Sequence, residues 1–307
     1  MNDHIPLPLP LATDADPQHL TDEQAVGYVS RWFVQAIFPY RKTEALARQV
    51  QNGPDRITVM SANGLPYGKY PRLIMAYIIT AAVQRDGAVQ RGTLSMNEAR
   101  RIPLGRSMNT FLEALGLQRG NGGSRGSLTA IREQLRRLTS STITVQKLYR
   151  DRDQGINAPV ARSWDLWFDS ANPDQATITE SYIELTEDFY QAIIAAPIPI
   201  DLDILQKLGK PRAMDLYVWL SLKKFWLSKR AEDSHEFSWE TLAGHFSPTP
   251  LSTSQELADF RREIRRCTER IEELWPAVGV EVTSTGLTVQ SGSPSVPIRR
   301  SRKAPEL

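Results

Sequence analysis

The stretch PRLIMAYI at residues 71–78 returns 140 residues later, in similar form, as PRAMDLYV at residues 211–218. Each copy follows closely on a Gly-Lys pair. Further along, IREQLRR at residues 131–137 returns as FRREIRR at residues 260–266. Because the two repeated elements occur in the same order in both halves of the chain, we predict one domain built twice.

Each half is predicted to follow the order helix, strand, helix, helix, strand, strand, which is that of a winged helix. Pro71 suits the first turn of a helix, where its missing N–H is not needed. In the first half the predicted elements span residues 71–84, 93–96, 107–115, 127–138, 142–149 and 160–168. In the second half they span residues 211–226, 236–237, 239–246, 255–274, 280–283 and 287–290. The predicted fold class is α+β, with two tandem winged-helix domains arising from an internal duplication.

Four further elements are predicted outside this repeated order. The run Thr21-Asp22-Glu23-Gln24 has the form of a capping box, which predicts a helix from residue 25 to about residue 38. Alternation predicts short strands at residues 56–60 and 178–185, and Thr186 begins a helix over residues 187–195.

The chain of 307 residues, with 41% apolar content, is long enough for two domains with a core each. The predicted division has a disordered tail at 1–18, an N-terminal winged-helix domain at 19–170, a C-terminal winged-helix domain at 171–291 and a basic tail at 292–307. The Pro-rich, acidic N-terminus does not resemble a signal peptide. We therefore expect a bacterial cytoplasmic protein without a membrane partner.

Charge is unevenly distributed, although the net charge is only +2. Residues 97–152 hold eleven Lys or Arg against four Asp or Glu, and residues 163–206 hold nine acidic residues and no basic one. A basic block beside an acidic one favours a face that binds a polyanion. The alternative is that the two blocks pair within the fold.

The third predicted helix of each half carries arginines on the side away from its apolar stripe. In a helix-turn-helix this helix enters the major groove, and the arginine fork matches guanine and phosphate oxygens. The candidate DNA-binding residues on the two helices are Arg125, Thr129, Arg132, Arg136, Arg262, Arg265 and Arg266. The alternative is a solvated face with i,i+4 partners. Acidic residues on the third helix of the second half limit any DNA face to its N-terminal half; they are Glu256, Asp259, Glu263, Glu269, Glu272 and Glu273.

Further candidates for phosphate contact flank these helices. Arg100, Arg101 and Arg106 lie near the second helix of the first half, and Lys147 and Arg150 lie on its predicted hairpin. Each is also consistent with plain surface. The tryptophans are expected in the core rather than as platforms for base stacking.

No catalytic or cofactor site is predicted, so the protein is not expected to be an enzyme. Cys267 is the only cysteine and there are four histidines, without a His-x-His or Glu-x-x-His pair. The run from Gly64 to Lys69 is too short for a P-loop. A tyrosine-dependent nicking enzyme stays an alternative, but the chain lacks the histidine cluster expected of a metal site.

The chain resembles the plasmid-encoded RepA replication initiators over about residues 25–290. The segments that carry the resemblance are YGKYPR at 67–72, GRSM at 105–108, LRRL at 135–138, LTEDFY at 185–190, PIPIDL at 197–202, and DLY with WL at 215–220.

The resemblance implies a theta-type initiator whose two winged-helix domains bind direct repeats, called iterons, in double-stranded DNA at a plasmid origin. It further implies recruitment of host replication proteins (initiator and helicase), a role in copy control, and self-association as a dimer. A winged-helix transcriptional repressor, acting on its own gene and without an initiator role, is the main alternative.

Overall fold

The computed structural model describes residues 26–34, 36–52, 55–118, 126–148, 153–166 and 181–296. The helices are α1 (Lys69–Gln90), α2 (Met96–Ala99), α3 (Met108–Ala114), α4 (Ser127–Thr139), α5 (Glu187–Ile194), α6 (Leu202–Leu208), α7 (Pro211–Arg230), α8 (Trp239–Phe246) and α9 (Ser254–Leu274), with short 3-10 turns η2 (Arg31–Phe33) and η3 (Pro276–Val278). The strands are β1 (Val26–Ser30), β2 (Ala47–Asn52), β3 (Asp55–Ser61), β4 (Arg101–Gly105), β5 (Ser141–Leu148), β6 (Asp153–Pro159), β7 (Ala161–Asp165), β8 (Ser181–Leu185), β9 (Pro197–Asp201), β10 (Ser234–Ser238), β11 (Val280–Val282) and β12 (Gly286–Gln290). The chain is thus a mixed α and β protein.

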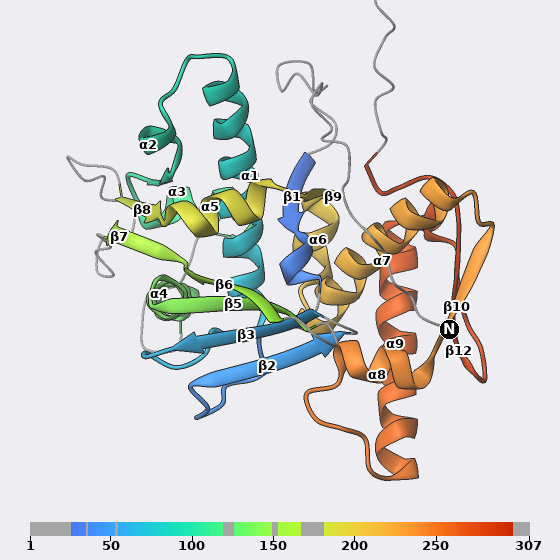
Figure 1. The fold of residues 1–307 in the computed structure, drawn as a ribbon. Coiled ribbons are helices and arrows are strands. Elements are labelled where there is room, and N and C mark those ends of the chain that lie inside the picture. The colour runs from blue at the N-terminus through green and yellow to red at the C-terminus, as the bar shows by residue number, and fades with distance from the viewer. Residues whose placement is uncertain are drawn as a thin grey trace, which may run out of the picture.

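The two helices that open with the repeated stretch, α1 and α7, contact each other at the centre of the molecule. The helix α4 packs on α1, and α9 packs on α7. In Figure 1, α4 and α9 therefore lie on either side of the α1 and α7 pair. The repeat in the sequence places the two arginine-bearing helices on opposite flanks of one centre.

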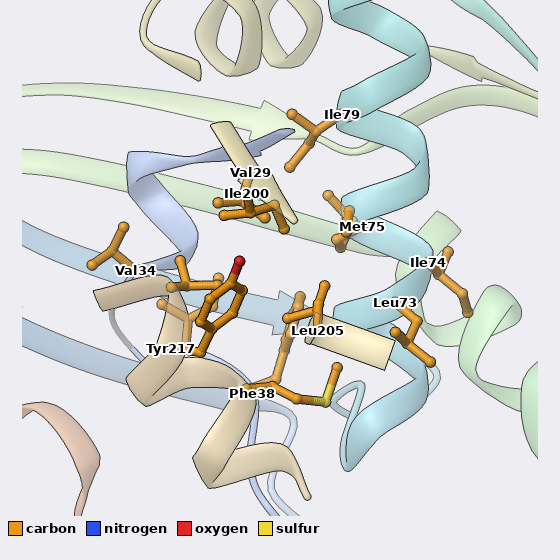
Figure 2. Packing of buried hydrophobic residues seen from close by; sticks show 14 of the residues in the cluster. Val29, Val34, Phe38, Leu73, Ile74, Met75, Ile79, Ile200, Leu205 and Tyr217 are labelled. Carbon is orange, nitrogen blue, oxygen red and sulfur yellow. The ribbon is translucent and has the colours of Figure 1, made fainter. Parts of the chain in front are cut away.

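A continuous cluster of buried apolar side chains runs through both halves, from Val29 on β1 to Val289 on β12. Figure 2 shows Met75 of α1 close to Ile200 of β9, with Tyr217 of α7 nearby. Burial of such side chains is the main favourable contribution to folding. Because one cluster serves both halves, each half helps to stabilise the other.

The second half follows the predicted order of elements: α7, β10, α8, α9, β11 and β12. Its antiparallel sheet has the strand order β10-β12-β11, so the strand after α7 pairs with the last strand of the terminal hairpin. Ser238 caps α8, and Thr253 with Glu256 forms a capping box at the start of α9.

The first half has the same order of main elements but a different pairing of strands. The hairpin β5-β6 extends a four-stranded sheet of order β2-β3-β5-β6, and β4 belongs to a separate sheet of order β4-β8-β7. The predicted strand at residues 93–96 is wrong, because Ser95 and Glu98 form a capping box that begins α2 instead. The strand follows at Arg101–Gly105.

Both strands predicted for the hairpin of the first half are present, as β5 and β7, but they do not pair with each other. The strand β5 pairs with β6, which lies mostly between the two predicted strands, and β7 pairs with β8. Thr144 Oγ1 donates to Asn157 Oδ1 over 2.8 Å across the hairpin. Polar side chains along β6 gave no apolar alternation, which is why the strand was missed.

The predicted N-terminal helix over residues 25–38 is also wrong within the described residues. Residues Val26–Ser30 form β1, which pairs with β9, and the turn η2 follows. The amide of Tyr28 donates to Thr80 Oγ1 over 2.8 Å, and Gly27 lets Leu202 of α6 lie against the strand. These contacts with distant residues outweigh a local helical preference.

Three pairs of strands cross the predicted domain boundary between residues 170 and 171. The strand β8 pairs with both β4 and β7, and β1 pairs with β9. The division into residues 19–170 and 171–291 stays a prediction. The helix α1 also differs from its predicted end, because it continues through Asp86 and Gly87 to Gln90.

Candidate nucleic-acid interface

The helix α4 presents its predicted polar face to the surface. Thr129, Arg132 and Arg136 are exposed. The predicted apolar stripe is buried: Leu128, Ile131, Leu135 and Leu138. Within the described residues Arg132 and Arg136 form no salt bridge, so their guanidinium groups are available to an anion.

One arginine of α4 has an internal role that the sequence did not reveal. Arg137 is 7% exposed; its Nε donates to Glu133 over 2.7 Å, and its Nη1 donates to the carbonyl of Leu65 over 2.9 Å. Its guanidinium lies 5.2 Å from the ring centre of Tyr67. Arg137 therefore ties α4 to the segment before α1 rather than facing outward. Its place beside the buried Leu138 was the only hint in the sequence.

The helix α9 repeats this arrangement in the second half. Arg262, Arg265 and Arg266 are exposed, whereas Phe260 and Ile264 face the core. Arg262 lies 3.2 Å from the carboxylate of Asp259, and both side chains are more than half exposed. Pairs of this kind contribute little to stability and are readily exchanged for another anion.

The C-terminal half of α9 has a different charge. Glu269, Glu272 and Glu273 are exposed there, and Arg270 pairs with Glu273. A polyanion would be repelled by this half of the helix. The basic part of α9 is therefore its middle, at Arg262, Arg265 and Arg266, and the exposed acidic residues Asp259 and Glu263 flank Arg262.

The three arginines near α3 have different surroundings. Arg100 is 7% exposed and donates from Nη2 to Asn97 over 2.8 Å, which leaves little guanidinium surface for DNA. Arg101 is exposed at the start of β4, and its guanidinium stacks 3.6 Å from the ring centre of Tyr182. Arg106 is exposed before α3. Stacking fixes the position of Arg101 while leaving the edges of its guanidinium able to donate.

The hairpins carry fewer cations than expected. Lys147 is half-buried on β5, opposite Asp55 of β3 and Gln154 of β6. Arg125 and Arg150 lie outside the described residues. The hairpin β11-β12 has no Lys or Arg, and Thr283 and Thr285 at its tip donate to the carboxylate of Glu236.

Three buried ionisable residues, His245, Cys267 and Lys224, lie in the interior of the second half rather than on these surfaces. Burial lowers the pKa of His245 to about 4, and Lys223 adds to the effect. Burial raises the pKa of the Cys267 thiol to about 11, with a further contribution from Glu263. Lys224 is 1% exposed and donates to the carbonyls of Val278 and Gln290. Among the described residues, no three His, Cys, Asp or Glu side chains are grouped as metal ligands would be.

More than half of the chain matches the model of one protein family. The model of the family described as "Plasmid encoded RepA protein" matches residues 65–241, which is more than half of the chain. The chain belongs to this family. The resemblance predicted from the sequence is therefore confirmed.

The matched segment of this RepA-family chain runs from just before α1 into α8. It includes α4 and the β5-β6 hairpin but ends before α9. The assignment of a DNA face to α9 therefore rests on the geometry of α9 itself.

The other comparisons add little to the RepA assignment. No curated protein matches the chain. A crystal structure of domains 2 and 3 of RctB is similar with a TM-score of 0.45 and 11% sequence identity, over 76% of this chain and 84% of that one. Within the described residues, the helices are too short or too polar to span a membrane.

Proposed function

We propose that this RepA-family protein is a sequence-specific, double-stranded DNA-binding initiator of plasmid replication that binds direct repeats, or iterons, at its origin. The observation that carries the proposal is the pair of exposed arginine rows on α4 and α9. Each row lies on the third main helix of its half and is followed by a β-hairpin. Membership of the family supports the same function.

The two halves act in this proposal as tandem winged-helix domains from an internal duplication, over residues 19–170 and 171–291. The face with Arg132 and Arg136 would enter one major groove, and the face with Arg262, Arg265 and Arg266 another. Segments read on one side of a duplex are about 34–36 Å apart. Linkage of the two domains raises the affinity for a site with both segments.

Basic residues outside these helices would position the duplex without reading its sequence. Arg101 and Arg106 are exposed beside α3, and Lys147 lies on the hairpin that follows α4. Contacts with phosphates fix register and orientation and do not carry sequence information. Arg100 is left out of this set because of its burial.

Recruitment of host replication proteins and dimerisation belong to the same proposal. The acidic segment at residues 163–206 would be repelled by DNA, and within it Glu187 and Asp188 are exposed at the start of α5. This surface suits a protein partner or a second subunit. In this role the protein binds and assembles without a chemical step of its own.

A winged-helix repressor would have the same DNA-facing helices, so the arrangement of DNA sites separates the two functions. The test is a footprint of the purified protein on the DNA flanking its own gene, at two salt concentrations. Protected and evenly spaced direct repeats that persist at higher salt would support the initiator. A single inverted site at the promoter would favour the repressor, and unphased protection lost with salt would contradict sequence-specific binding.

Single substitutions on α9 test the role of its arginines. We expect Arg262→Ala or Arg265→Ala to weaken specific binding by ~1–3 kcal/mol and to relax the preference at one base pair. Binding titrations with the protected duplex and with random duplex measure both effects. Arg270→Ala is the matched control, because Arg270 lies on the acidic half of the same helix and pairs with Glu273. An equal loss on both duplexes would instead assign a phosphate contact.

A further inference from the structure

The two repeated stretches meet through a buried ion pair. Arg72, at the start of α1, donates from Nε and Nη2 to the two carboxylate oxygens of Asp215 on α7, both over 2.7 Å. Each side chain is 7% exposed. The remaining donors of Arg72 bind the carbonyls of Gly68 and Phe38. A bidentate pair held in this way fixes both distance and orientation.

The pair breaks the symmetry of the repeat. Residue 75, which is equivalent to Asp215, is a methionine in the first copy and is buried. The carboxylate of the second copy therefore serves the arginine of the first. Such an arrangement joins two copies to each other and contributes nothing within either one.

The arginine equivalent to Arg72 in the second copy reaches the DNA-facing helix. Arg212 pairs with Glu263 of α9 and is 13% exposed. Its Cζ lies 4.7 Å from the ring centre of Tyr40, while the Cζ of Arg72 lies 5.2 Å from the same ring. Tyr40, from the first half, therefore contacts the repeat arginine of each copy.

A third arginine, Arg48, connects the first half to the turn that precedes α9 in the second half. Arg48, on β2, donates from Nε to the carbonyl of Ala36 over 3.2 Å and from Nη1 to the carbonyl of Pro248 over 3.5 Å. Pro248 lies in the turn between α8 and α9. The strand β2 belongs to the sheet that contains the β5-β6 hairpin. Arg48 thus links this sheet to the turn that precedes α9.

We infer that Arg48, Arg72 and Arg212, the arginine junction, fix the placement of α9 relative to α4 and thereby determine the spacing between the two DNA segments that one chain reads. These are positioning residues, and Arg72 is too buried to contact DNA itself. The inference rests on the proposed function. A rigid connection favours only the spacing that it matches, whereas a loose one tolerates several.

The variant for the test is Arg48→Gln/Arg212→Gln, which loosens the junction and retains the buried Arg72–Asp215 pair. The matched control is Arg162→Gln, because Arg162 forms an exposed pair with Glu184 away from the junction. The probes are duplexes that carry the DNA site protected by the unmodified protein. Between its two parts, one bound through α4 and the other through α9 in the proposal, zero to about six base pairs are inserted. A duplex with one part alone reports binding by a single half.

For the unmodified protein and the control, we expect insertions to reduce affinity by about 10²-fold or more. For the double variant we expect a flat profile over spacing, with weaker binding at the natural spacing and unchanged binding to the single part. A profile that stays as steep as that of the unmodified protein would overturn the inference. So would an equal loss on every duplex, since that indicates a contact with DNA or a loss of fold.

A distance measurement without DNA keeps the inference separate from the proposed function. Spin labels at Arg132→Cys and Ala258→Cys, in a Cys267→Ala background, report the distance between α4 and α9. We expect a narrow distribution that broadens in the double variant and stays narrow in the control. An unchanged narrow distribution would overturn the inference. Absence of any protected DNA segment, with the broadening present, would contradict the proposed function alone.

Discussion

Replacement of Asp215 by methionine is the most direct test of how the halves are held together. Methionine is the residue that the first repeat has at the equivalent position, residue 75. The change removes the counter-charge of the Arg72 guanidinium, whose side chain is only 7% exposed. Two of its four hydrogen bonds remain, those to Gly68 and Phe38.

The expected loss follows from burial and geometry. Two opposite charges about 4 Å apart, at an effective dielectric constant of about 20, attract by ~4 kcal/mol. Breaking one partner of a buried pair typically costs ~3–5 kcal/mol, because the other charge stays desolvated. We therefore expect Asp215→Met to lower the free energy of unfolding by ~3–5 kcal/mol, and Arg72→Met by at least as much, since it also leaves two carbonyls without their donor.

A double-mutant cycle followed by urea unfolding at pH 7 separates the pair from its surroundings. In Arg72→Met/Asp215→Met both charges are gone, so the loss should be ~2–4 kcal/mol smaller than the sum of the single losses. Arg162→Met serves as the control, because its pair with Glu184 is exposed and should be worth at most ~1 kcal/mol. Additivity of the two single variants within ~0.5 kcal/mol would refute the reasoning.

Two further predictions concern the second half. His245 has a folded pKa of about 4, below its ordinary 6.5, so the unfolded state binds more protons between these values. The contribution of neutral His245 to the free energy of unfolding is present above pH 6.5 and is lost as the pH falls toward 4. By pH 5 the loss is ~2 kcal/mol. The substitution His245→Gln should remove this part of the pH dependence of unfolding. A variant as sensitive to pH as the unmodified protein would contradict this. Gly286→Ala should destabilise, because a Cβ there would overlap the carbonyl oxygen of Phe237 in the paired strand, whereas Gly244→Ala, in open space on α8, should stabilise by ~0.5–1 kcal/mol. If the urea midpoints of these two glycine variants shifted in the same direction, one of the two predictions would be wrong.

The helices α4 and α9, which we propose face DNA, could be predicted because their pattern is local. Every fourth or third residue of a helix lies on one face, so the stripe from Leu128 to Leu138 and the arginines between its members were assigned from spacing alone. Arg137 is the exception. In a helical projection Arg137 lies near the apolar stripe, but its partners, Leu65 and Tyr67, are about 70 residues away in the chain.

The sequence by itself determined the two repeated stretches, the family, and the positions of α1, α4, α7 and α9. The helices could be placed because they form from bonds and contacts between near neighbours. Only the tertiary structure decided the partner of β4, the strand β1 in place of a helix, and the meeting of Arg72 with Asp215. Those features depend on residues far apart in the chain, and their stability comes from burial and pairing that exist only once the two halves have packed together.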